Sequence, residues 1–294
     1  MSEEKRAARL RELDALRGLA ALAVLLYHYT YFIGEPLPSL QVELGHVGVP
    51  LFLGISGFVI TTSLARVPSV SAFARARAIR LLPTYWLGML VTSAVVLLTA
   101  PGRFEVPAVD VPANVAMVQL LVGARMIDGA YWTLNVELFF YICMAAAWRL
   151  GLLRRLDFLV MGWLGLSFAW MLASSAGSAA RWLLVIDYVP FFAVGMIASQ
   201  IWSGEKSLKE QLLLFALPTV ITLATQPESV GAIFVNTIVL LLVGTGHLQR
   251  IAVAPLLWLG RISYPLYLTH GVIGYCLIPK LHEAGLTPIR PSSS

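Results

Sequence analysis

Charged residues are scarce in this sequence, and cysteine is almost absent from it. Only 13% of the 294 residues are charged and 58% are hydrophobic, whereas soluble domains carry about 25% charged residues. This scarcity excludes an ordinary soluble domain and indicates a protein that crosses a membrane several times. The two cysteines, Cys143 and Cys276, lie in apolar runs without metal-ligand spacing, so we expect neither a disulfide framework nor a metal site.

Long hydrophobic runs make up most of the chain. Each is close to the roughly 20 residues that cross a hydrocarbon core. We predict nine spans, at 13–33, 47–65, 81–100, 131–149, 156–174, 183–202, 211–226, 230–248 and 255–279. Segment 114–126 is too short to cross and is expected to form an interfacial or re-entrant helix. The predicted fold class is all-α, a polytopic transmembrane helix bundle that forms one domain over residues 1–294.

Basic residues gather on one side of the predicted spans. With the N-terminus in the cytoplasm, the inner segments hold fourteen Lys and Arg residues and the outer segments hold five. Cytoplasmic loops of membrane proteins carry such an excess, so we predict a cytoplasmic N-terminus and an outer C-terminus. Topology therefore accounts for the net charge of +5 without a nucleic-acid partner.

The first predicted span carries three ionisable residues, Asp14, Arg17 and His28. Arg17 and His28 are eleven residues apart, which places them on one helical face with a rise of about 16 Å between them. Ionisable groups inside a span are costly and mark functional sites. In the alternative interpretation, Asp14 and Arg17 anchor the helix at the interface and His28 packs against a neighbouring helix.

Two further charged groups are candidates for the same site. Arg75, Arg77 and Arg80 follow the second span and are able to hold phosphates bidentately, although their spacing alone favours ordinary loop charge. Glu137 is predicted to lie in the middle of the membrane, where a carboxylate must be protonated, paired or exposed to a wet cavity. Its structural alternative is a buried carboxylate satisfied by Asn135 or a neighbouring tyrosine.

Two spans carry features that packing or an interface would explain. The small residues of the second span favour close helix packing; they are Gly48, Gly54, Ser56 and Gly57. The last span contains Tyr264, Tyr267 and His270, and tyrosines near an interface often form only an aromatic belt.

Five stretches, taken together, resemble the acyltransferase-3 family of integral membrane O-acyltransferases. In chain order they read LDALRGLAALAVLLYH, GVPLFLGISGFVI, RARAIRLLPTYW, YWTLNVELFFY and ISYPLYLTH. The resemblance implies transfer of an acyl group, commonly acetyl, from acyl-CoA to a hydroxyl. The implied acceptor is a sugar of a surface polysaccharide, lipid-linked glycan or peptidoglycan. Acetyl-CoA would be a co-substrate rather than a tightly bound cofactor, and the protein would lie in the bacterial inner (plasma) membrane.

The resemblance also assigns roles to individual residues. Arg17 and His28 match the family's arginine and histidine of the first helix. Arg77 and Arg80 match its paired arginines, and Glu137 matches the acid of its tryptophan–glutamate motif. We therefore predict His28, Arg17 and Glu137 as catalytic residues, and Arg75, Arg77 and Arg80 as the binding site for the donor phosphates.

The sequence departs from the family pattern at two places. Pro50 follows Gly48 and Val49, where the family has an aspartate, so an acidic contact is missing there. The family also implies another span after the ISYPLYLTH stretch, whereas no apolar run follows Pro279. We therefore expect about nine spans, one fewer than is usual.

Acyl transfer also fits these residues on physical grounds. A neutral sugar hydroxyl attacks a thioester slowly, and a base that takes its proton accelerates the step by roughly 10²–10⁴-fold. A neutral imidazole such as that of His28 suits this task near neutral pH. Backbone or arginine N–H groups would then stabilise the oxyanion of the tetrahedral intermediate.

Two other functions remain open from the sequence. Membrane-buried Arg, His and Glu also suit the proton pathway of a glycan transporter or flippase, although the sequence shows no inverted repeat of the kind that many transporters have. Within the enzyme interpretation, the acceptor would alternatively be a small glycosylated metabolite.

Overall fold

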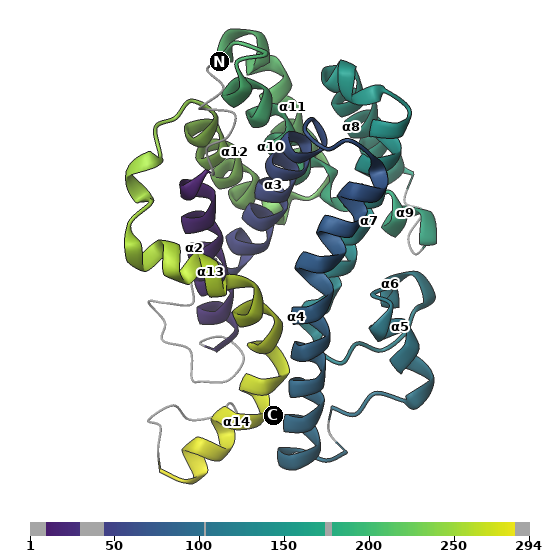
Figure 1. Cartoon of the computed structure of the whole chain (residues 1–294), viewed down its shortest axis with the longest axis vertical. Coiled ribbons are helices and arrows are strands. Elements are labelled where there is room, and N and C mark those ends of the chain that lie inside the picture. The colour runs from purple at the N-terminus through teal and green to yellow at the C-terminus, as the bar shows by residue number, and fades with distance from the viewer. Residues whose placement is uncertain (1–9, 30–43, 103, 174–177, 286–294) are drawn as a thin grey trace.

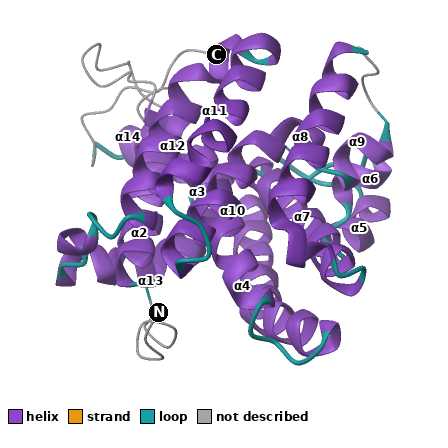
Figure 2. Ribbon diagram, turned by 90° about the horizontal axis from the view of Figure 1, so that it is seen from above, coloured by secondary structure: helices purple, strands orange, loops and turns teal. Residues whose placement is uncertain are grey.

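The structure is a computed structural model, and it describes residues 10–29, 44–102, 104–173 and 178–285. Every regular element among these residues is helical (Figures 1 and 2), which confirms the all-α prediction. Seven helical segments are long and apolar enough to cross a membrane, and they coincide with the second to eighth predicted spans. They contain α3 (Leu44–Leu64), α4 (Val70–Thr99), α7 (Trp132–Arg149), α8 (Leu156–Leu172), α10 (Val189–Ser203), α11 (Leu208–Thr225) and α12 (Val230–Gly244).

The first and ninth predicted spans differ from this pattern. Helix α2 (Arg11–His28) has 18 residues, four of them charged, and is not among the seven; residues 30–33 of that predicted span lie outside the described residues. The prediction of one continuous helix over 255–279 is wrong. The chain there forms α13 (Ala254–Thr269) and α14 (Gly271–Glu283), with His270 between them.

Asp128 explains the break between α13 and α14. Its carboxylate accepts a hydrogen bond of 2.8 Å from the backbone N–H of Val272, in the first turn of α14. Such a side chain satisfies an N–H group that has no partner within its own helix. A Cβ atom at Gly271 would lie only 2.4 Å from an Asp128 carboxylate oxygen, so glycine at this position permits the contact.

Close helix contacts at glycines set the arrangement of the bundle. Helix α3 packs against α2, α10 and α12, and α2 packs against α13. A Cβ atom at Gly195 of α10 would lie 1.8 Å from the Gly54 carbonyl oxygen, and one at Gly260 of α13 would lie 2.1 Å from the Asp14 carbonyl oxygen. The Gly54 contact confirms the packing interpretation for this residue of α3, and the Gly260 contact brings α2 and α13 close together.

Helix α4 is longer than predicted. It begins at Val70 rather than near residue 81, and the Ser69 side chain caps it by accepting a hydrogen bond from the Ala72 N–H. The segment predicted as a loop is therefore mostly helix. Its three arginines consequently have fixed directions around the axis of α4.

Residues 104–128 contain only short helices. These include α5 (Val111–Val115) and α6 (Gln119–Val122), which are too short to span, as predicted, and which lie beside the lower part of α4 in Figure 1. The Asn135 side chain is fully buried and donates a hydrogen bond of 2.8 Å to Gln119 Oε1. The remaining short elements are α9 (Ala179–Leu183), η2 (Ala108–Asp110), η3 (Gly129–Tyr131), η4 (Leu152–Arg155), η5 (Ile186–Tyr188), η6 (Pro227–Ser229) and η7 (Gln249–Ile251).

Candidate active site

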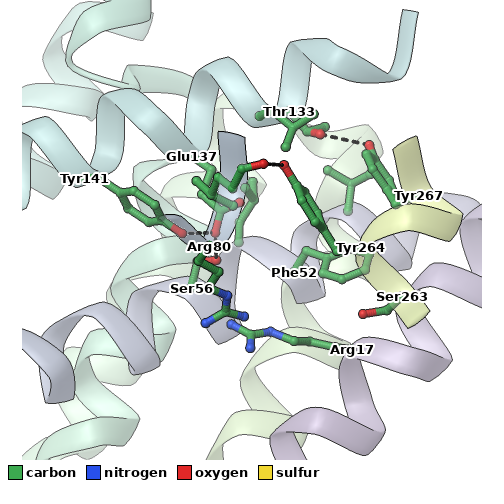
Figure 3. Close-up of a pocket in the computed structure, with 14 residues that line it drawn as sticks. Arg17, Phe52, Ser56, Arg80, Thr133, Glu137, Tyr141, Ser263, Tyr264 and Tyr267 are labelled. Carbon is green, nitrogen blue, oxygen red and sulfur yellow. Dashed lines mark hydrogen bonds between the residues drawn. The ribbon is translucent and has the colours of Figure 1, made fainter. Parts of the chain in front are cut away.

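A cavity of about 90 Å³ lies among α2, α3, α4, α7 and α13 (Figure 3). Three predicted site residues line it from three different helices: Arg17 from α2, Arg80 from α4 and Glu137 from α7. Charged residues far apart in the sequence thus converge on one cavity with a mixed polar and apolar lining. We call it the inner cavity.

Helical periodicity places the polar residues of the inner cavity on common faces. On α7, Thr133, Glu137 and Tyr141 are spaced four residues apart and all line the cavity. On α13, Tyr264 and Tyr267 are three residues apart and do the same. Side chains three or four residues apart lie on one side of a helix, so each helix presents a stripe to the cavity.

Glu137 is held by two hydroxyl groups. Its Oε1 atom accepts a hydrogen bond of 2.7 Å from Ser56 Oγ on α3, and a second hydrogen bond from the hydroxyl of Tyr141. An ionised carboxylate only accepts hydrogen bonds, and both partners here donate. Glu137 lines the inner cavity, and a neighbouring tyrosine satisfies its carboxylate, as the structural alternative expected. Its catalytic role stays a prediction. Asn135 is not the partner that satisfies Glu137, because its side chain donates a hydrogen bond to Gln119.

Arg17 and Arg80 bring two positive charges together at one end of the inner cavity. Figure 3 shows their guanidinium groups next to each other, and the two charges repel. Both arginines also line a second cavity of about 640 Å³, the middle cavity. An anion placed between the two guanidiniums would relieve their repulsion and accept several charge-assisted hydrogen bonds. The geometry therefore favours an anion at the junction of the two cavities.

The other two predicted arginines differ from Arg80 in their surroundings. Arg77 donates a hydrogen bond of 2.9 Å to Ser63 Oγ. Its guanidinium carbon lies 5.4 Å from the ring centroid of Phe73 and 5.8 Å from that of Tyr141. Arg75 is exposed on α4. Among the described residues, neither arginine is part of the lining of the inner or middle cavity. Their roles in donor binding stay predictions.

His28 does not belong to the described lining of the inner cavity but contacts it through His270 and Tyr267. Its catalytic role stays a prediction. Its ring packs edge-on against His270, with centroids 4.8 Å apart. The ring of His270 is in turn 5.3 Å from the ring of Tyr267, which lines the inner cavity and bonds to Thr133. Tyr267 and His270 therefore lie between His28 and the cavity, whose described lining does not include His28.

Sequence reasoning expected a neighbouring tyrosine as a partner of Glu137 without naming Tyr141, and it missed Ser56 as a partner. Tyr141 follows Glu137 by one helical turn, and that four-residue spacing was the available signal. Ser56 was interpreted as a packing residue. Its hydroxyl donates to Glu137 across the helix contact, which spacing along one helix does not reveal.

Residues 10–291 of the chain match the family model described as an acyltransferase domain. The chain is 25% identical over 268 residues to Nodulation protein 10 of Rhizobium leguminosarum bv. viciae, covering 80% of this chain and 72% of that protein. It is 24% identical over 303 aligned residues to the proposed acetyltransferase ORF330 of Acidianus two-tailed virus, covering 94% of this chain and 88% of that protein. No solved structure matches it significantly.

Proposed function

The chain belongs to the acyltransferase-3 family, and from that premise we propose that it is a membrane O-acyltransferase that moves an acetyl group from acetyl-CoA to a sugar hydroxyl. The proposed acceptor is a surface polysaccharide, a lipid-linked glycan or peptidoglycan. The observation that carries the proposal is the convergence of Arg17, Arg80 and Glu137 on one cavity between spans.

The size and charge of the cavities support a short-chain acyl-CoA as the donor. The phosphates of CoA are the kind of anion that the junction between Arg17 and Arg80 favours. The inner cavity, at about 90 Å³, has room for roughly six to nine water-sized groups, since one water needs at least about 10–15 Å³. An acetyl group fits that space.

The proposed reaction proceeds through a tetrahedral intermediate. The acceptor oxygen attacks the thioester carbonyl carbon, and the hydroxyl proton passes to Nε2 of His28 as general base. Nδ1 of His28 donates a hydrogen bond of 2.8 Å to the Val24 carbonyl oxygen, which leaves Nε2 as the accepting nitrogen. Nearby backbone or arginine N–H groups stabilise the oxyanion. The carbon–sulfur bond then breaks, the acyl group stays on the acceptor oxygen, and the CoA thiolate takes up a proton as it leaves.

The position of His28 supports an approach of the two substrates from opposite sides. The middle cavity opens along the N-terminal part of α2 at Leu13 and Asp14, whereas His28 lies at the other end of the same helix. With the N-terminus in the cytoplasm, the donor enters at the cytoplasmic end. The acceptor meets it from the outer side, close to Tyr267 and His28.

The orientation is tested by labelling a single cysteine at position 71. Ser71 is exposed near the start of α4, so Ser71→Cys in a chain with Cys143→Ser and Cys276→Ser offers one accessible thiol. We expect a membrane-impermeant maleimide to label it only after the cells are permeabilised. Labelling in intact cells would reverse the orientation and, with it, the side from which the donor enters.

The activity is tested with purified protein, acetyl-CoA and isolated glycan acceptors. We expect release of free CoA that depends on the acceptor, together with acetate ester on the glycan. The acceptor is identified as the glycan that loses acetyl groups when the gene is deleted. If no CoA is released while glycan crosses the membrane of proteoliposomes, the protein is a transporter and the proposal is wrong.

A further inference from the structure

Two larger cavities continue from the junction of Arg17 and Arg80, away from the inner cavity. The middle cavity shares Thr62, Arg66 and Trp202 with a third cavity of about 970 Å³, the outer basic cavity. The three cavities thus follow one another through shared lining residues. They form one route from Glu137 to the arginines beyond the end of α3.

Helix α3 runs along the whole route, so its rise gives the length of the route. Its residues Val49 to Ser56 line the inner cavity, Val59 to Ser63 line the middle cavity, and Thr61 to Leu64 line the outer basic cavity. At 1.5 Å per residue, Ser56 and Leu64 are separated by roughly 12 Å along the helix axis. A ligand with one end beside Ser56 and the other beyond Leu64 must therefore be long and thin.

The outer basic cavity has the chemistry of a nucleotide site. Arg66, Arg149 and Arg154 line it together with the indole rings of Trp148 and Trp202. The Arg66 guanidinium lies 5.9 Å from the centroid of a Trp202 ring. Arginines bind phosphate bidentately, and aromatic rings stack with nucleobases. The carboxylate of Glu205 also lines the cavity, and it suits a ribose hydroxyl or an amino group rather than a phosphate.

We propose that the outer basic cavity binds the nucleotide end of the acyl-CoA donor. This inference rests on the proposed function and assigns the donor's remaining atoms to residues. The adenine lies against Trp148 or Trp202, and the 3′-phosphate binds Arg149 and Arg154. The pyrophosphate lies in the middle cavity between Arg66 and the pair Arg17 and Arg80, all of which line it. The thiol arm then carries the thioester through the inner cavity towards His28.

Arg154 and Arg155 provide a matched pair for the test. They are neighbours in η4 and both are exposed. Arg154 lines the outer basic cavity, and Arg155 is outside its lining as far as the described residues show. Loop charge that only sets topology would make the two arginines equivalent, whereas a phosphate site distinguishes them.

The experiment measures the binding of CoA and of 3′-dephospho-CoA by calorimetry. The purified protein is held in nanodiscs of zwitterionic lipid, so anionic headgroups do not compete for the arginines. We expect the wild-type protein to bind CoA more tightly than 3′-dephospho-CoA. Arg149→Gln with Arg154→Gln should weaken CoA binding roughly tenfold or more, because charge-assisted hydrogen bonds are lost, and should remove the preference. Arg155→Gln should keep both properties.

A truncated donor separates this inference from folding and from the proposed function. S-acetyl-pantetheine lacks the nucleotide, so its turnover should be the same in the wild type and in the Arg149/Arg154 double variant. If the wild type binds no CoA, the proposed donor and the nucleotide site both fall. If it binds CoA but the double variant keeps the affinity and the preference for the 3′-phosphate, the nucleotide lies elsewhere and only this inference is overturned.

Discussion

His28→Ala and His28→Asn are expected to abolish acyl transfer while expression and membrane insertion persist. Asparagine still forms hydrogen bonds but cannot accept the proton of the acceptor hydroxyl. Loss of a general base costs roughly 10²–10⁴-fold in rate, enough to remove detectable turnover. The measurement is release of free CoA from acetyl-CoA by each purified variant, at matched protein levels and with a saturating acceptor.

His270 provides the comparison for this result. Its ring contacts His28 at 4.8 Å between centroids, and it is almost fully buried. We expect His270→Ala to weaken activity without abolishing it, because the His28 ring loses a packing neighbour but keeps its proton-accepting nitrogen. If His28→Asn retains most of the wild-type rate, His28 is a packing residue. Glu137, which lines the inner cavity, then becomes the candidate base, and Glu137→Gln tests it.

The sequence was sufficient for the parts of this fold that depend on composition along single helices. Seven spans follow from apolar length alone. Arg17 and Glu137 stood out because a charge inside a span is costly and needs a polar surrounding, and both line the inner cavity. Their convergence with Arg80 did not follow from spacing. It depends on helix contacts at glycines such as Gly48, which faces α2, and Gly260.

The features that were not predictable depend on neighbouring helices. The break at His270 comes from Asp128, which is remote in sequence and caps α14. Arg77 and Arg80 were treated as one pair because they are three residues apart. That spacing still leaves about 60° between them around a helix. In the packed bundle, this difference in direction means that Arg77 bonds to Ser63 whereas Arg80 lines the inner cavity.

Because the described lining of the inner cavity includes Arg80 and not Arg77, we expect substitutions of these arginines to change the KM for acetyl-CoA by different amounts. We expect Arg17→Gln and Arg80→Gln each to raise the KM for acetyl-CoA roughly 10- to 100-fold, since each removes charge-assisted hydrogen bonds to one shared anion. Arg77→Gln should change that KM less, because its guanidinium bonds to Ser63 and covers Tyr141. Lysine at position 17 or 80 should restore binding only in part, since a point charge lacks the planar fork. Steady-state kinetics at varied acetyl-CoA check each variant.

The double variant decides whether Arg17 and Arg80 act on the same anion. Two independent sites would multiply their effects on KM, whereas residues that share one partner are non-additive. We expect Arg17→Gln with Arg80→Gln to raise the KM much less than the product of the single effects, because the first substitution already disrupts the shared anion site. Arg155→Gln should leave the KM unchanged. An unchanged KM in both single variants, in correctly inserted protein, would show that the junction does not bind the donor.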